Sequence, residues 1–329
     1  MRCLGCYKEN TEGFCRGCRS KLFDGANVPH FLPFNAPNDA NLTDYQEKTK
    51  HLSISGVQLK YSLKREGKKL LLTEKSGQYI LKPIPQGQLV MRDQLPENEH
   101  LTMQIAEQVF GIKTAASCLI YFSDGTPAYL TRRFDVKRDG TKFLQEDFAQ
   151  IAGKTKQNSG DHYKYNSAYT DIGLLIKKHV AASAPMLEQF FLQVVFNYII
   201  SNGDAHLKNF SLIQSSDGDY VLAKAYDLVS TVLHTPNESD TALDLYAGDG
   251  DTDHYKKYGC YGREDFEILA TKIGLIPVRA KRILDNLKDP ANRVSTVTES
   301  MVTNSLLTDN AKDAYVKAFK DKMARFTKY

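Results

Sequence analysis

The stretch ISNGDAHLKNFSLI, residues 200–213, sets a polar segment against the most apolar part of the chain. It follows MLEQFFLQVVFNYIIS, residues 186–201, which is apolar on almost every helical face and therefore predicts a buried central helix. Asn202 and Gly203 end that helix, Asp204 follows at once, and four residues separate Asp204 from Asn209. The question is what a carboxylate and an amide do at the edge of a core.

A third polar position comes at the far end of a predicted β-hairpin. FSLI, the turn SSDGDY and VLAKA lead to Tyr226 and Asp227, so two carboxylates and one amide oxygen lie near the same helix-to-strand junction. Phosphoryl transfer needs such a set, because a carboxylate orients or deprotonates the acceptor hydroxyl and oxygen ligands hold Mg²⁺. We expect Asp204 to be the catalytic residue and Asn209 with Asp227 to bind Mg²⁺. The Asp-x4-Asn spacing matches the protein-kinase catalytic loop, although the preceding His-Arg pair is missing.

The region before this site alternates in the way that short strands do. GVQLKYSLK, LLLT and QYILKP predict three antiparallel strands, LPENEHLTMQIAEQVFG predicts a helix, and SCLIYF and AYLTRRF predict two more strands. Lys82 ends the third strand and is the candidate nucleotide lysine, and the helix beginning near Glu97 and Glu99 follows it in kinase order. The preceding loop LSISGVQ offers hydroxyls and amides to the ATP phosphates from Ser53, Ser55, Gly56 and Val57.

Helical patterns dominate after Asp135, so the predicted fold is α+β. It is two-lobed and protein-kinase-like, with a small antiparallel β N-lobe and a mainly helical C-lobe. We expect residues 1–28 to form a separate cysteine knuckle, residues 29–134 the N-lobe and residues 135–329 the C-lobe. The polar stretch GKTKQNSGDHYKYNS, residues 153–167, is expected to be mobile and to touch substrate or a partner.

Four cysteines crowd into the first eighteen residues as CLGC and CRGC. Cys3, Cys6, Cys15 and Cys18 can present four thiolates to one tetrahedral ion, and Gly5 and Gly17 ease the tight turns. Two disulfides are the alternative. Because the chain starts without an apolar export segment, we expect a cytoplasmic, reducing environment and favour a structural Zn²⁺.

Bulk composition narrows the class of protein. The formal net charge is +4, and much of the excess positive charge falls in the last predicted helix. So small a net charge does not predict direct nucleic-acid binding. No run approaches the roughly 18 apolar residues of a membrane span. We expect no membrane association.

Several segments, in order, resemble the HipA family of bacterial toxin kinases. They are SISGVQLK, YILKP, ENEH, TRRFD, QEDFAQ, NGDAHLKNFSL and YDLVS, from about residue 52 to residue 230. The resemblance implies a Ser/Thr protein kinase that uses ATP and Mg²⁺ and is regulated by autophosphorylation of Ser53 or Ser55. It also implies the nucleotide role of Lys82, the catalytic role of Asp204, and Asn209 and Asp227 as metal ligands.

The Ser-Ile-Ser arrangement resembles the short HipT-like branch of that family. Full-length HipA has an additional N-terminal β-subdomain where this chain has its cysteine knuckles. The resemblance therefore implies a helix-turn-helix antitoxin and a small protein similar to the missing subdomain as partners, and an aminoacyl-tRNA synthetase as the phosphorylated target. Phosphate on either serine would repel the ATP phosphates, so self-inhibition is expected. The alternative is that these serines donate hydrogen bonds and nothing more.

Two other functions remain open from the residues themselves. Small-molecule kinases of the antibiotic phosphotransferase type use a similar Asp-x4-Asn loop, and a kinase-like binding module would need no catalysis. His206, two residues after Asp204, either orients that carboxylate or packs in the core.

Overall fold

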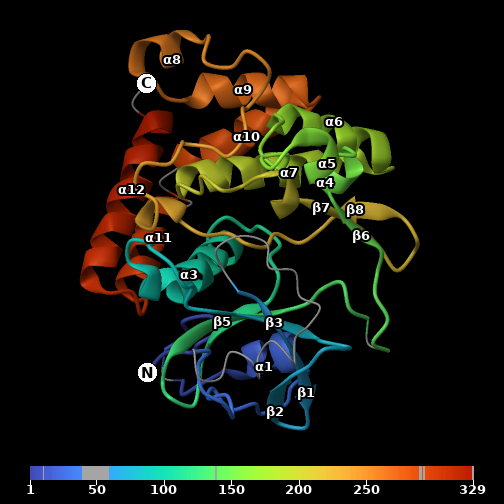
Figure 1. Ribbon diagram of the computed structural model, residues 1–329. Helices are drawn as coiled ribbons and strands as arrows, with labels where there is room; N and C mark the ends of the chain where they lie inside the picture. Colours follow the sequence, from blue (N-terminus) through green and yellow to red (C-terminus); the bar gives the residue numbers. More distant parts are fainter. Residues whose placement is uncertain (10, 39–58, 138, 289–290, 292, 328–329) are drawn as a thin grey trace.

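The chain folds into a β-sheet part and a larger helical part, with helix α3 (Leu95–Gln108) between them (Figure 1). The structure is a computed structural model that describes residues 1–9, 11–38, 59–137, 139–288, 291 and 293–327. Ser53, Ser55, Gly56 and Val57, all predicted to contact nucleotide, lie outside the described residues. Among the described residues, no helix has both the length and the apolar character to cross a membrane.

The N-terminal sheet has five antiparallel strands in the order β2-β1-β3-β5-β4. They are β1 (Tyr61–Glu66), β2 (Lys69–Leu72), β3 (Tyr79–Pro83), β4 (Ser117–Tyr121) and β5 (Pro127–Arg132). Gly67 and Gly125 adopt positive φ in the two hairpin turns, a conformation that glycine takes without steric cost. The predicted order of three strands, a helix and two strands is confirmed. Of the run predicted as the first strand, residues 56–58 lie outside the described residues; Leu59 and Lys60 are not in the strand, and β1 begins at Tyr61.

The first 28 residues pack onto this sheet rather than apart from it. Helix α1 (Arg16–Phe23) and the cysteine segment place Cys3, Phe14 and Phe23 in one apolar cluster with Leu63 and Leu81 of the sheet. The Leu119 amide of β4 also donates to the Leu4 carbonyl at 2.9 Å. The segment therefore extends the core of the sheet. Its predicted status as a separate domain stays a prediction.

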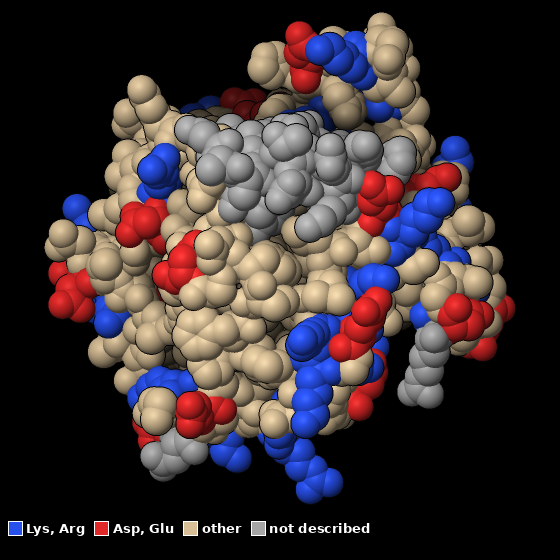
Figure 2. Space-filling view, turned by 60° about the horizontal axis from the view of Figure 1, so that its bottom comes forward, with Lys and Arg blue, Asp and Glu red and all other residues tan. Residues whose placement is uncertain are grey.

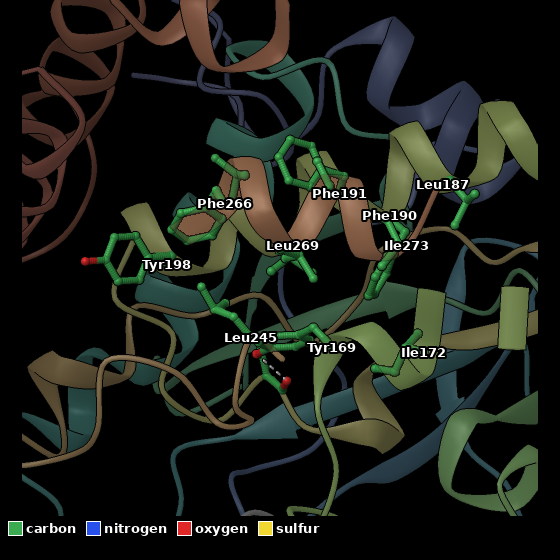
Figure 3. Close-up of a cluster of buried hydrophobic side chains, with 14 of the residues drawn as sticks. Tyr169, Ile172, Leu187, Phe190, Phe191, Tyr198, Leu245, Phe266, Leu269 and Ile273 are labelled. Carbon is green, nitrogen blue, oxygen red and sulfur yellow. Dashed lines mark hydrogen bonds between the residues drawn. The ribbon is translucent and has the colours of Figure 1, made fainter. Parts of the chain in front are cut away.

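The C-terminal part is built around α7 (Ser183–Ile199), the predicted central helix. Phe190, Phe191 and Tyr198 of α7 are buried against Tyr169 and Phe266 (Figure 3). Burial of each such side chain stabilises the fold by roughly 1.5–3 kcal/mol. This cluster therefore anchors α7, whose C-terminal end leads into the polar loop. The other helices are α4 (Phe148–Ile151), α5 (Lys156–Ser159), α6 (Tyr169–His179), α8 (Asp253–Tyr258), α9 (Arg263–Lys272), α10 (Pro277–Lys288), α11 (Val294–Thr303) and α12 (Asp309–Thr327).

A small second sheet follows α7. Its strands are β6 (Gln145–Asp147), β7 (Ser211–Gln214) and β8 (Tyr220–Leu222), and β7 lies in the middle. The predicted β7–β8 hairpin is present, but β8 ends at Leu222 rather than at Ala225. Residues 223–226 then run as connecting chain to Asp227.

Helix α3 joins the two parts. Its residues from Pro96 to Ala106 are all buried, because one side packs on β4 and β5 and another on α11. Thr102 and Tyr315 of α12 share a hydrogen bond of 2.9 Å. On the sheet-side face of the molecule, acidic and basic side chains lie next to one another with a broad uncharged area between them (Figure 2). Among the residues that the structure describes, no continuous basic surface is seen on that face (Figure 2).

Candidate active site

Lys82 lies at the centre of the candidate site. It is 3% exposed on β3, and its ammonium donates to Glu99 Oε1 at 2.5 Å and to Asp227 Oδ1. The ammonium also lies 5.3 Å from the ring centroid of Tyr129, its register partner on β5. The buried lysine thus joins the sheet, α3 and the segment after β8.

The charges of this group support one another. Burial would lower the pKa of Lys82, but the carboxylates of Asp227 and Glu99 outweigh burial and hold that pKa above its ordinary value. For Asp227, burial would raise the pKa, and Lys60 and Lys82 together hold it below the usual range. Burial raises the pKa of Glu99, which Lys82 opposes. At neutral pH the ammonium of Lys82 and the carboxylate of Asp227 are therefore both charged.

Helix geometry decides which acid of ENEH meets Lys82. Residues two apart point to different sides of a helix, so Glu97 and Glu99 cannot share a partner. Glu99 faces Lys82, whereas Glu97 Oε1 accepts from the Tyr7 hydroxyl and from the Leu306 amide, each at 2.8 Å. The sequence pattern named both Glu97 and Glu99 after Lys82 and did not distinguish which of them binds the lysine.

Asp227 occupies a constrained backbone position. Its φ of +56° is uncommon for a residue with a side chain, although aspartate tolerates it better than most. Its Oδ2 accepts from Lys60 at 3.3 Å. The neighbouring Tyr226 hydroxyl donates to the Lys208 carbonyl at 2.9 Å, which ties this segment to the loop that carries Asn209.

The loop that bears Asp204 is held by a hydrogen-bond network. The Gly203 amide donates to Thr231 Oγ1 at 2.8 Å, and Thr231 in turn donates to Glu238. A Cβ on Gly203 would lie 2.6 Å from Glu238 Cδ and 2.7 Å from the Ser239 carbonyl oxygen, so no larger residue fits without a shift. Burial raises the pKa of Glu238 to about 7.

Asp204 itself is accessible, with 52% of its side chain exposed. Its Oδ1 accepts a hydrogen bond from the Tyr165 hydroxyl at 2.5 Å. His206 Nε2 lies 3.9 Å from the same oxygen, beyond a normal hydrogen bond. Burial lowers the pKa of His206 to about 4, so the ring is neutral at pH 7. The structure thus places His206 as a packed residue in edge contact with Tyr165 rather than as a close partner of Asp204.

Asn209 is 9% exposed and its Oδ1 accepts from the His206 amide at 3.1 Å. An amide oxygen has a second lone pair, so this bond leaves acceptor capacity for a cation. The charges of Asp204 and Asp227 both act on the pKa of His206, three residues before Asn209. Burial lowers the pKa of Lys164, and the charges of Asp204 and of Lys60, the partner of Asp227, also act on that pKa.

The structure therefore brings Lys82 and Asp227 into direct contact and sets Asp204 and Asn209 on the adjoining loop. Carboxylate and amide oxygens are ligands that Mg²⁺ takes in proteins, and Asp227 already binds two cationic groups. The oxygen atoms of Asn209 and Asp227 are thus of the kind that a divalent cation takes.

Sequence reasoning missed three contributors to the site. Lys60 falls within the predicted first strand and the segment SISGVQLK, but nothing in either pattern assigned it a role in the site, and the Thr231–Glu238 pair lies far along the chain. Tyr165 belongs to the polar stretch 153–167, which was expected to touch substrate, but its bond to Asp204 needed the tertiary structure. No spacing pattern in the sequence links these residues to Asp204 or Asp227.

The four N-terminal cysteines form a separate candidate metal centre. Their sulfur atoms all lie within 4.8 Å of one another and none is in a disulfide. The Cys6 and Cys15 Sγ atoms are 3.7 Å apart, and a tetrahedral zinc with Zn–S of about 2.3 Å has sulfur–sulfur edges of about 3.8 Å. Backbone amides of Gly5 and Cys15 point at Cys3 Sγ, at 3.5 and 3.2 Å, as they would at a thiolate.

Gly5 is needed in this centre for close approach. A Cβ there would lie 2.8 Å from Cys18 Sγ, whereas a Cβ on Gly17 would meet the Cys15 sulfur at an ordinary 3.9 Å. The residues present can hold one tetrahedral metal ion, and the arrangement contradicts the alternative of two disulfides.

Comparison with known proteins places these observations in a family. The HipA-like C-terminal domain matches residues 52–295. A Haemophilus influenzae protein named "Putative kinase" is 27% identical, over 96% of this chain and 93% of its own length. A Sinorhizobium fredii protein with a name of the same kind is 29% identical over 77% of this chain, which spans 60% of that protein.

Two solved structures share the fold. A chain of the Shewanella oneidensis complex of HipA, HipB and operator DNA matches 91% of this chain and 74% of its own length, with a TM-score of 0.65 and 19% identity. The Helicobacter pylori proinflammatory kinase CtkA matches 75% of this chain and 87% of its own, with a TM-score of 0.50 and 14% identity. These likenesses confirm the predicted kinase-like α+β fold. Because the family domain matches most of the sequence, this chain belongs to the HipA-like C-terminal domain family.

Proposed function

We propose that this protein is a HipA-like serine/threonine protein kinase that transfers the γ-phosphoryl group of ATP to a protein hydroxyl. One observation carries the proposal. The buried Lys82 is held by Glu99 of α3 and by Asp227, while an accessible Asp204 stands on the adjoining loop. A lysine paired with a helix glutamate, a metal-binding aspartate and a separate acceptor aspartate are the parts that kinase chemistry requires.

Each residue then has a defined task. Lys82 would bind the nucleotide phosphates, and Asn209 and Asp227 would hold Mg²⁺, which neutralises charge on the transferred group when bound. Asp204 would accept the hydrogen bond of the acceptor hydroxyl and orient it for attack. The Tyr165 hydroxyl makes that same contact in the structure, so an acceptor must displace it.

Family membership supports the finer parts of the proposal. We assign autophosphorylation to Ser53 or Ser55, with self-inhibition as its consequence, and keep the short HipT-like branch as the expected position in the family. The Shewanella HipA structure contains HipB, which supports a helix-turn-helix antitoxin as partner here. A small partner similar to the HipA N-terminal subdomain, and an aminoacyl-tRNA synthetase as target, complete the proposal.

The cysteine centre is proposed to hold a structural Zn²⁺. Four protein thiolates leave no open position for substrate, so the ion would stabilise the N-terminal segment and take no part in the transfer. Apparent binding energies for such sites are on the order of 10 kcal/mol.

Incubation with labelled ATP and Mg²⁺, followed by mass-spectrometric mapping of phosphate, tests the function. We expect label on Ser53 or Ser55 in the wild type and none in Asp204→Asn. Asp217→Asn, at an exposed aspartate in the β7–β8 turn, is the matched control and should label normally. Label found on an added aminoglycoside or metabolite alone would indicate a small-molecule kinase. Absence of any label would indicate a binding module.

A further inference from the structure

The cysteine segment contacts α3 near both of its ends. At the first turn, the Tyr7 hydroxyl donates to Glu97. At the last turn, Gln108 Nε2 donates to the Cys6 carbonyl at 3.3 Å. Lys21 of α1 forms a 2.6 Å ion pair with Glu107. A segment that touches one helix at several points can determine where that helix lies.

Tyr7 provides the most buried of these contacts. It is 8% exposed, its ring lies 5.2 Å from that of His100 on α3, and its φ is +60°. The backbone around it is closed by two bonds, from the Tyr7 amide to the Cys3 carbonyl at 2.9 Å and from the Cys3 amide to the Lys8 carbonyl at 2.8 Å. This closed turn contains Cys3 and Cys6, so whatever fixes those two cysteines also fixes Tyr7.

The receiving carboxylate is an unusual one. Glu97 is 6% exposed, its Oε1 accepts from both Tyr7 and Leu306, and its Oε2 has no hydrogen-bond partner among the described residues. A buried carboxylate with one unpaired oxygen depends strongly on the donors that it has. Glu97 belongs to the same helical turn as Glu99, the partner of Lys82.

We propose that a zinc ion bound by the four cysteines positions α3 through Tyr7 and Glu97, and thereby sets the Lys82–Glu99 pair. The N-terminal segment is then a positioning element for the site, not a cap on the chain end. The consequence for nucleotide binding rests on the proposed kinase function, whereas the coupling between metal and helix does not. Tyr7 is a positioning residue, because it acts through Glu97 and touches no reacting group.

The test uses the full-length protein purified with zinc and compares three variants with the wild type. Tyr7→Phe removes the hydroxyl and keeps all four cysteines. Cys15→Ser removes one metal ligand. Tyr220→Phe, at an exposed tyrosine of β8, is the matched control. The measurements are bound zinc per chain, hydrogen exchange of the amides of residues 99–103, and ATP affinity.

We expect Tyr7→Phe to retain one zinc ion while exchange of residues 99–103 accelerates by about 10-fold, the consequence of losing one buried hydrogen bond. ATP affinity should fall in parallel. Cys15→Ser should lose zinc and show the same or faster exchange in α3, with Tyr220→Phe unchanged in all three measurements.

Two results would overturn the coupling. One is a wild type that binds no zinc, and the other is a Tyr7→Phe variant in which α3 exchanges as slowly as in Tyr220→Phe. If the wild type binds zinc and shows the coupling but no ATP binding, the proposed kinase function fails and the positioning of α3 stands. The two ideas are therefore tested separately.

Discussion

Replacing Lys82 by methionine removes one charge from the centre of the site while keeping the side chain's length. Lys82 and Glu99 are each 3% exposed, so Lys82→Met leaves the Glu99 carboxylate buried without its cation. Breaking a buried pair in this way costs about 3–5 kcal/mol. Asp227 is affected less, because Lys60 stays 3.3 Å from it and 28% of its side chain is exposed. We therefore expect a loss of about 3–5 kcal/mol in the free energy of unfolding at pH 8.

The size of the loss should depend on pH. Burial raises the pKa of Glu99, and without Lys82 that pKa rises further. A carboxyl whose folded-state pKa exceeds its unfolded-state value keeps its stability at low pH and loses it as pH rises through the folded pKa. Lys82→Met should thus be less destabilised at pH 5.5 than at pH 8.

Glu99→Met and the double variant Lys82→Met/Glu99→Met complete the cycle. An apolar pair of similar volume often replaces a buried ion pair at little cost. We expect the double variant to regain at least about 2 kcal/mol over Lys82→Met and still to transfer no phosphate. The chain has no tryptophan, so urea unfolding is followed by far-ultraviolet circular dichroism. A loss that is the same at both pH values, or a double variant whose loss is the sum of the two single losses, would refute the reasoning.

Three further predictions concern the loop around Asp204. Asp204→Asn should abolish phosphate transfer and leave the free energy of unfolding within about 0.5 kcal/mol of wild type, because the side chain is half exposed; urea curves and labelling assays check both parts. Tyr165→Phe should raise kcat/KM for the protein acceptor by about 5- to 10-fold in initial-rate assays, since the phenol competes with the acceptor for Asp204 Oδ1. A fall in kcat/KM would instead show that Tyr165 orients the carboxylate. Gly203→Ala should lower the free energy of unfolding by about 1–3 kcal/mol and lower kcat, because its methyl group would meet Glu238 and Ser239. Thermal unfolding measures the loss, and Gly17→Ala, whose methyl group would make only an ordinary contact, is the control.

Much of the fold could be predicted from the sequence, because its signals are local. Alternation with period two marked the strands on either side of α3, and the all-round apolar pattern of residues 186–201 marked α7. The spacing between Asp204 and Asn209 and the hairpin leading to Asp227 likewise involve neighbours along the chain. The Cys-x2-Cys pairs placed four thiolates near one another for the same reason.

Local patterns could not place the strand ends, since these depend on what each residue meets across the sheet. The run predicted as strand through Ala225 ends as β8 at Leu222. The Ala223 amide still donates to the Ser211 carbonyl of β7, and Ala225 then pairs with Thr114 instead. Leu59 and Lys60 continue the alternating pattern and yet lie outside β1, and Lys60 binds Asp227 instead.

The sequence by itself determined the order of strands and helices, the charged residues available to the site and the metal-binding potential of the cysteines, because each depends on residues close together in the chain. The tertiary structure alone decided that Glu99, not Glu97, binds Lys82. It alone also decided that the Tyr165 hydroxyl donates to Asp204 and that Tyr7 joins the cysteine segment to α3. These contacts join residues 17, 39 and 90 positions apart. The contacts of Glu99 and Glu97 depend on the rotation of α3 about its axis, and that of Tyr165 depends on how the stretch 153–167 packs beside the loop after α7, where the Leu207 amide donates to the Lys164 carbonyl. No local pattern encodes either arrangement.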